Sequence, residues 1–194
     1  MKSKISKILI IMGLLICVGS LSIKGYSKYL ENKSIKNFEE KIDKSSNEPK
    51  EDDFSNVKAG DEIAIINIPS IDLNTVVIES IEKEYLNHYV CHFENTAMPG
   101  QYGNFSIAGH SSYRYNEVFN EAHKISLGDE IIIKTLNNEF TYIVKDILEV
   151  NPEDTYVLDQ DNEIKELTIV TCTNKGKDRL IIKAQITDNK NNNK

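Results

Sequence analysis

The stretch LTIVTCTNKGKDRLII, from Leu167 to Ile182, has the pattern of a β-hairpin. Two runs rich in β-branched residues flank NKGK, a segment suited to a tight turn. A turn centred within NKGK places Cys172 directly opposite Arg179, with their Cβ atoms about 5 Å apart on one face. Arg179 is one of only two arginines among the chain's 23 Lys and Arg residues. The hairpin therefore predicts a thiol beside a guanidinium, and a one-residue slip of register would separate them.

A nucleophilic cysteine needs a base, because a free thiol is only a few per cent ionised near neutral pH. The chain offers four histidines: His88, His92, His110 and His123. His110 is the best candidate, since it ends the predicted strand NFSIAGH, where Gly109 leaves room for its side chain to face a cleft. His92 adjoins Cys91, but consecutive residues diverge on a strand or a helix, so that pair has poor geometry.

Arg179 suits the stabilisation of an oxygen better than proton transfer. A guanidinium does not act as a base near neutral pH, but it donates several hydrogen bonds to a carbonyl or an oxyanion. Cysteine, histidine and arginine together predict acyl transfer through a thioester, in which the imidazole pairs with the thiol and later protonates a leaving amine.

The rest of the chain between residues 61 and 187 is rich in short strand patterns. Only short helices are predicted, over 82–90 and 116–125, the second with Asn116 as its N-cap. Because the links between strands are irregular, this pattern predicts a mixed, mostly antiparallel barrel. The predicted strands cover 62–71, 73–80, 104–110, 129–136, 139–150, 167–173 and 178–186.

The N-terminal part of the chain predicts export. Residues 1–7 are basic, and residues 8–23 carry no charge. Sixteen helical residues cover roughly 24 Å, and flanking lysines can snorkel towards the ends of a hydrocarbon core of about 30 Å. A retained signal anchor is favoured over a cleaved secretory signal, because VGS is a poor cleavage site. The single-pass anchor would contact membrane lipid and leave everything after residue 23 outside the cell membrane.

The remaining boundaries follow from composition. Residues 24–60 are polar and predict a spacer, in which 26–43 have the pattern of a juxtamembrane helix with a thin apolar face. Residues 61–187 form the predicted catalytic domain, and 188–194 form a disordered tail. A net charge of −7 argues against nucleic acid as a partner. No metal site or cofactor is expected. The acidic residues Glu117, Glu121 and Asp161 offer oxygens to calcium, but solvated surface charge explains them more simply.

Several of these segments together resemble the sortase family, the cysteine transpeptidases of Gram-positive cell surfaces. TIVTC, Thr168 to Cys172, resembles the family's TLxTC signature with Ile169 in place of Leu. GNFSIAGH, ending at His110, resembles the segment that carries the family's catalytic histidine. Arg179 lies seven residues after the cysteine, where the catalytic arginine is expected. The segments HFENTAMPGQYGN and FNEAHKISLGDEI also resemble sortase blocks in order and spacing.

The resemblance implies an eight-stranded sortase β-barrel that cleaves an LPxTG-type sorting motif between Thr and Gly. It implies Cys172 as the nucleophile, His110 as the general acid and base, and Arg179 as the transition-state stabiliser. An amine of the peptidoglycan precursor would then resolve the thioester. A substrate groove lined by Ala108, Thr171 and His92 is also expected.

Two departures from the family bear on its subclass. Many relatives have arginine directly after the catalytic histidine, whereas this chain has Ser111. The link between Val150 and Leu167 leaves no room for the long helical insertion of class B, which favours a class D-like or class A-like enzyme. Two alternatives stay open: an extracytoplasmic thiol redox protein that uses Cys172, and a non-catalytic wall-binding module.

Overall fold

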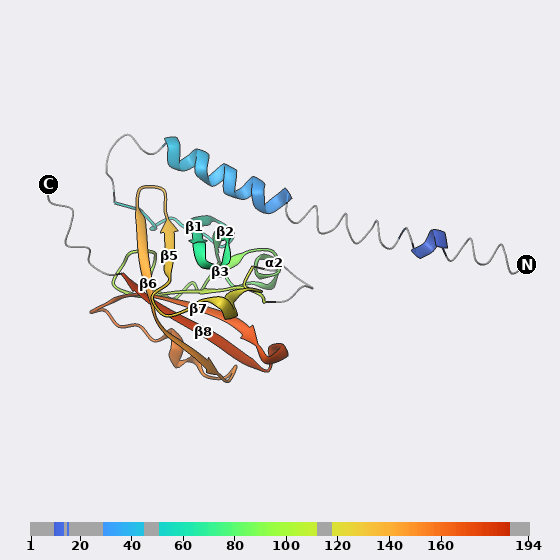
Figure 1. Cartoon of the computed structure of the whole chain (residues 1–194). Coiled ribbons are helices and arrows are strands. Elements are labelled where there is room, and N and C mark those ends of the chain that lie inside the picture. The colour runs from blue at the N-terminus through green and yellow to red at the C-terminus, as the bar shows by residue number, and fades with distance from the viewer. Residues whose placement is uncertain (1–9, 14, 16–28, 45–50, 112–117, 187–194) are drawn as a thin grey trace, which may run out of the picture.

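The β-branched runs form strands that close into a barrel (Figure 1). The computed structural model describes residues 10–13, 15, 29–44, 51–111 and 118–186. Around the barrel the strands follow the order β1-β2-β3-β4-β7-β8-β6-β5. Their bounds are β1 Glu62–Ile68, β2 Leu73–Glu79, β3 Val90–His92, β4 Gly103–Ala108, β5 Glu130–Lys134, β6 Glu139–Val150, β7 Lys165–Thr173 and β8 Asp178–Ile186.

Strand pairing confirms the prediction of a mixed, mostly antiparallel barrel. Only β2–β3 and β4–β7 are parallel among the strand pairs of the described residues. The β5–β6 and β7–β8 hairpins form as expected. The described helices between the strands are short, namely η1 Pro69–Ile71, α2 Lys83–Leu86, η2 Ala122–Lys124, η3 Thr155–Leu158 and η4 Asn174–Gly176. Of the helix predicted over 116–125, residues 116–117 lie outside the described residues, and only the turn of η2 is helical in the rest.

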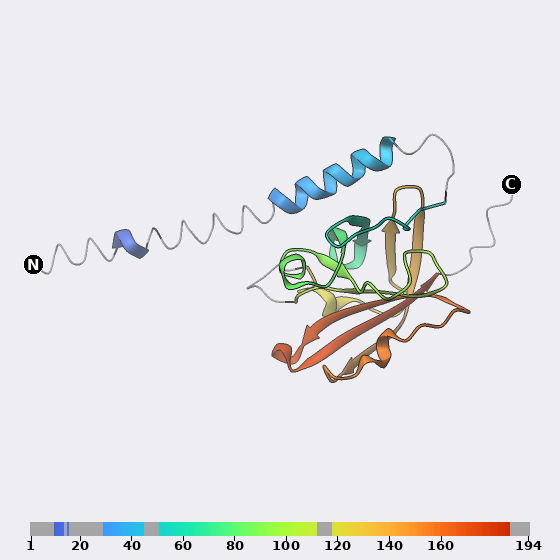
Figure 2. The same ribbon diagram turned by 180° about the vertical axis from the view of Figure 1, so that it is seen from behind.

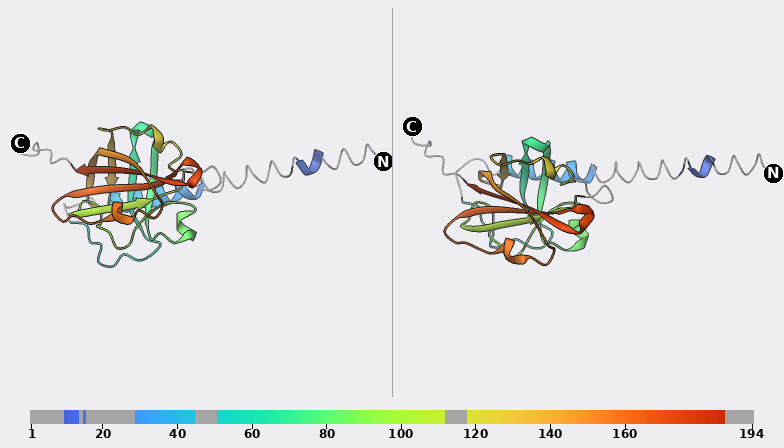
Figure 3. Two further views of the ribbon diagram at one scale, coloured as in Figure 1. Left: turned by 90° about the horizontal axis from the view of Figure 1, so that it is seen from below. Right: turned by 60° about the horizontal axis from the view of Figure 1, so that its bottom comes forward.

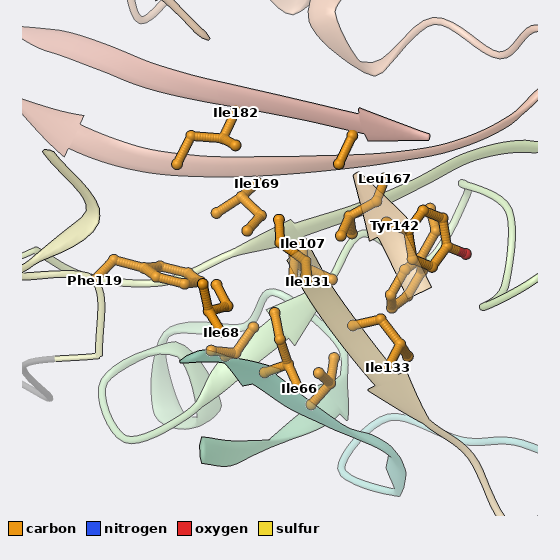
Figure 4. Packing of buried hydrophobic residues seen from close by; sticks show 14 of the residues in the cluster. Ile66, Ile68, Ile107, Phe119, Ile131, Ile133, Tyr142, Leu167, Ile169 and Ile182 are labelled. Carbon is orange, nitrogen blue, oxygen red and sulfur yellow. The ribbon is translucent and has the colours of Figure 1, made fainter. Parts of the chain in front are cut away.

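The barrel interior is filled mainly by aliphatic side chains, together with the aromatic rings of Phe105, Phe119 and Tyr142 (Figure 4). Phe119 and Tyr142 are both almost fully buried, and they lie at opposite ends of the packed row. The Tyr142 hydroxyl accepts a hydrogen bond from the Gly100 N–H at 2.9 Å, so its polar atom is paired at the barrel end. Phe119 closes the end towards which β4 and β7 run.

Residues 29–44 form a helix that packs on the outside of the barrel. Phe38 on this helix is fully buried, and it contacts the outer face of β1, β2 and β3 together with the buried Cys91. Lys41 adds an ion pair to Glu62 at 2.9 Å. Figures 1 and 2 show the helix on the side of the barrel opposite the β7–β8 hairpin. This part of the predicted spacer 24–60 is therefore a helix held to the barrel, because the Phe38 side chain packs on the apolar outer face of β1, β2 and β3.

A second contact holds the chain after the helix to the barrel. The Asp52 carboxylate accepts hydrogen bonds from the turn between β5 and β6. Its donors are the Thr135 hydroxyl at 2.6 Å, the Asn137 N–H at 3.0 Å and the Asn138 amide at 2.7 Å. Asp52 therefore ties the chain after the helix to the turn between β5 and β6.

Of the anchor predicted over 8–23, only residues 10–13 and 15 lie within the described part of the chain, and they are helical. Within the described ranges, no helix has the length and apolar character needed to cross a bilayer. The tail predicted over 188–194 also lies outside them.

His92 lies inside the barrel, in a buried polar cluster. Its Nδ1 is 2.7 Å from Glu79 Oε2, and its ring packs against Phe105. The Thr96 hydroxyl donates its hydrogen to the Phe93 carbonyl, so it accepts a hydrogen bond from His92 Nε2 at 2.9 Å. The imidazole therefore ties β2 and β3 to the segment that leads into β4.

We expect Phe38→Ala to release the helix from the barrel and expose Cys91. Burial raises the pKa of Cys91 to about 12, so both access and ionisation of this thiol increase when the helix leaves. Peptide-resolved alkylation in a Cys172→Ala background should show Cys91 reacting at least about tenfold faster. Tyr29→Ala removes an exposed ring from the same helix and is the control. Equal Cys91 rates in both variants would show that Phe38 does not hold the helix.

We expect His92→Ala to lower the free energy of unfolding by about 3–5 kcal/mol, since it strands the buried Glu79 carboxyl without its partner. Urea denaturation followed by circular dichroism measures this change. His88→Ala, at an exposed histidine, should stay within about 0.5 kcal/mol of the parent. A His92 variant as stable as the His88 variant would contradict a structural role for the Glu79–His92 pair.

Candidate active site

The β7–β8 hairpin has the register that its sequence predicts. Cys172 pairs with Arg179, and Val170 pairs with Ile181 two residues further from the turn. Asn174 and Lys175 both have positive φ, as does Gly176, so the turn is tight enough to keep this register. The hairpin is a long twisted ribbon whose turn projects at one end of the barrel (Figure 3).

Cys172 and Arg179 lie on the outer face of the barrel wall. Side chains alternate along a strand, and Ile169 on β7 and Leu180 on β8 belong to the interior cluster. Cys172 is partly exposed and its thiol is free. Ala108 on β4 pairs with Val170 on the same outer face, and both are partly exposed. A row of small and apolar side chains thus leads to the thiol.

His110 lies beside Cys172 because the segment after β4 stays bonded to β7. The parallel ladder between the strands ends at Ala108, but the Gly109 N–H still donates to the Val170 carbonyl at 3.2 Å. The Thr171 hydroxyl donates to the Gly109 carbonyl at 2.8 Å. The Ser111 hydroxyl donates to the Cys172 carbonyl at 2.5 Å. Both neighbours of His110 are therefore tied to the end of β7.

The chain after His110 returns to the same place. The Phe119 N–H donates to the His110 carbonyl at 3.0 Å. A Cβ atom at Gly109 would lie 2.7 Å from the Phe119 ring, closer than real Cβ contacts. Glycine is therefore required at 109 so that Phe119 can close the barrel end directly behind His110.

A pocket of about 850 Å³ opens at this end of the barrel. It is lined by the histidine, the cysteine and the turn between β7 and β8, together with η2 and Phe119. The lining residues that carry polar side chains include His110, Ser111, Asn120, His123, Thr171, Cys172, Asn174 and Lys175. Imidazole and thiol therefore share one cavity that is large enough for part of a peptide.

The electrostatic setting favours proton acceptance by His110. Partial burial lowers the pKa of His110 below its ordinary value, because burial disfavours the charged imidazolium. Near neutral pH the ring is then mostly neutral and able to take a proton from a thiol. The Arg179 guanidinium donates hydrogen bonds to the carbonyls of Gly176 and Asp178, both at 3.3 Å. These long bonds to its own turn leave other donors of the guanidinium for an oxygen near Cys172.

The residues expected in the substrate groove take three different positions. Ala108 lies on the outer face near the thiol. Thr171 is buried, lines the pocket and donates to the Gly109 carbonyl, so it also positions the neighbouring segment. His92 differs from the expectation: it is fully buried with Glu79 and does not line the pocket. Cys91, its neighbour on β3, faces outward, so the alternation of side chains along the strand places His92 inside the barrel.

The hydroxyl bond from Ser111 to Cys172 has no counterpart in the sequence-based interpretation. The sequence shows only that serine follows His110, and a bond to a backbone carbonyl on another strand leaves no pattern in the sequence. The only sign of this bond in the sequence is that Ser111 stands where many relatives have arginine.

The described residues contain no group of three or more His, Cys, Asp or Glu side chains arranged to hold a metal ion. Of the acidic residues considered for calcium, Glu121 pairs with Lys124, while residue 117 lies outside the described part of the chain.

Comparison with known proteins agrees with this geometry. Sortase A of Bacillus anthracis is 33% identical over 111 residues, which cover 57% of this chain and 51% of that protein. The structure of a Clostridium perfringens Sortase D5 transpeptidase matches with a TM-score of 0.72 and 42% identity, covering 82% of this chain and 99% of that one. Sortase A from Corynebacterium diphtheriae matches with a TM-score of 0.64 and 28% identity, over 71% and 66% of the two chains.

The matched region spans about half the length of the first curated relatives. The family model described as Sortase domain matches residues 66–187, which comprise nearly all of the barrel and every residue discussed at its open end. The chain therefore belongs to the sortase family, whose members are cysteine transpeptidases.

Proposed function

We propose that this chain is a class D-like or class A-like sortase that cleaves an LPxTG-type sorting motif after Thr and transfers the acyl part to an amine. The observation that supports the proposal is that Cys172 and His110 line one pocket, while Arg179 is the strand partner of Cys172. The β7–β8 register sets Cys172 opposite Arg179, and the hydrogen bonds around His110 set the imidazole at the same pocket.

In the first half of the reaction, the Cys172 sulfur attacks the carbonyl carbon of Thr while His110 accepts the thiol proton. Arg179 donates hydrogen bonds to the oxyanion that forms on the former carbonyl oxygen. The intermediate then breaks its C–N bond, and His110 returns the proton to the leaving amine of Gly. The product is a thioester on Cys172.

In the second half, an amine of the cell-wall precursor attacks the thioester carbon. His110 accepts a proton from the attacking nitrogen, the C–S bond breaks, and His110 passes the proton to the departing sulfur to regenerate the thiol. Because one imidazole serves both halves, its neutral form must be present when the thiol or the amine arrives. The lowered pKa of His110 supports that requirement. No step needs a metal ion or another cofactor.

We propose that the domain works on the outer side of the cell membrane. The uncharged run over 8–23, flanked by lysines, supports a single-pass anchor. Substrates would then be surface proteins that carry the sorting motif, and the acceptor would be an amine of the peptidoglycan precursor.

The redox alternative lacks a second thiol near Cys172 among the described residues. Cys91 lies on β3, and β4 separates it from β7. Two strand spacings amount to about 9–10 Å, which exceeds the Cα separation of about 7 Å that a disulfide tolerates. A single thiol next to an arginine and a histidine suits acyl transfer better.

The decisive experiment incubates the full chain in detergent with an LPxTG peptide and an amine, and follows the products by mass spectrometry. We expect a Thr–amine product and an acyl adduct on Cys172. Both Cys172→Ala and His110→Ala should lose the product almost completely, whereas His92→Ala should retain more activity as long as it stays folded. Peptide left intact across a panel of sorting motifs would favour a wall-binding module. Peroxide consumption that needs Cys172 but not Arg179 would favour the redox protein.

Arg179→Lys should lower turnover by at least ~10²-fold, the scale of one lost oxyanion donor. The substitution keeps the charge but loses the planar fork of donors. Initial rates with saturating peptide measure the effect, and an unchanged thermal midpoint serves as the folding control. Near-full activity of the lysine variant would remove Arg179 from the mechanism.

A further inference from the structure

Ser111 bonds to β7 at the point where β4 can no longer do so. Alternate carbonyls of a strand point towards the same neighbouring strand. On β7, the Val170 carbonyl points towards β4 and accepts the Gly109 N–H. The next carbonyl on that side belongs to Cys172, which lies beyond the last paired residue of β4. The Ser111 hydroxyl donates to this carbonyl at 2.5 Å and so replaces the missing strand donor.

This bond acts on His110 from its far side. Gly109 before the histidine is held by its own N–H and by the Thr171 hydroxyl. Ser111, the residue after the histidine, is held by the bond from its hydroxyl to the Cys172 carbonyl. The His110 carbonyl accepts a hydrogen bond from the Phe119 N–H. Without the serine hydroxyl, the segment after His110 would lose its bond to β7 and keep only the bond from the Phe119 N–H to the His110 carbonyl. The imidazole would then be held less firmly relative to the end of β7.

The bond joins the backbones of the two reacting residues. Its donor follows His110 directly, and its acceptor is the carbonyl of Cys172 itself. Ser111 is only half-buried and its side chain is small, so removing its oxygen creates no cavity in the barrel interior. An effect of its loss on catalysis would therefore come from position and not from loss of the fold.

We propose that Ser111 is a positioning residue that fixes the His110 imidazole against the Cys172 thiol through the Cys172 carbonyl. This inference rests on the proposed function for its kinetic consequence. The position of His110 relative to the Cys172 thiol also affects the reactivity of that thiol, which can be measured without turnover.

The first test is steady-state kinetics of the full chain with a sorting peptide. Ser111→Ala should lower kcat about three- to tenfold, the cost of one hydrogen bond, with little change in KM for the peptide. Ser111→Thr keeps the hydroxyl and should recover most of kcat. Ser126→Ala removes an exposed serine from the loop before β5 and should match the parent. A threonine variant that stays as slow as the alanine variant while folding normally would overturn the proposal.

The second test is the rate of Cys172 alkylation by iodoacetamide as a function of pH. In the parent, the profile should contain the titration of the neighbouring His110. The Ser111→Ala profile should move towards that of His110→Ala, and the Ser111→Thr profile should return to the parent's. Alanine and control variants with identical profiles and identical kcat would overturn the positioning role.

The two tests separate the two proposals. If the parent turns over no sorting peptide but the alkylation profile still responds to Ser111, the proposed function fails and the positioning role stands. If the parent is active and neither kcat nor the profile responds to Ser111, the positioning role fails and the proposed function stands.

Discussion

The parallel pairing of β4 with β7 is the constraint on which the rest of the site depends. It joins segments that are 62 residues apart at the contact between Thr171 and Gly109. Because parallel strands end on the same side of a sheet, the residues that follow β4 and the last residues of β7 reach one end of the barrel together. This pairing brings Cys172 and His110 to the same end of the barrel.

The site continues that pairing with hydrogen bonds from side chains after the strand ladder has ended. The hydroxyl groups of Thr171 and Ser111 both donate to backbone carbonyls, and Phe119 closes the barrel behind them. The imidazole is thus held by a backbone that is bonded on both sides, which keeps a reacting pair in place before substrate arrives. The guanidinium is positioned independently, through the register of the β7–β8 turn.

The opposite side of the barrel contributes stability and orientation. A helix over 29–44 buries Phe38 on the outer face of β1 to β3, and Asp52 caps the β5–β6 turn. These contacts extend the folded unit towards the N-terminus beyond the strands. The helix and the internal Glu79–His92 pair hold β2 and β3 together, and β3 pairs with β4, the strand that leads to His110.

The sequence by itself determined the hairpins, the mostly antiparallel barrel and the Cys172–Arg179 register, because each follows from local alternation and a short turn. It also indicated His110 through the strand end and glycine before it. It indicated a helix over 26–43 with a thin apolar face, but it did not reveal that this helix docks on the barrel through Phe38. Nor did it reveal the inward position of His92, which depends on the face that β3 presents. Only the tertiary structure decided the bonding of Ser111 to Cys172, because that contact joins a side chain to a distant backbone carbonyl.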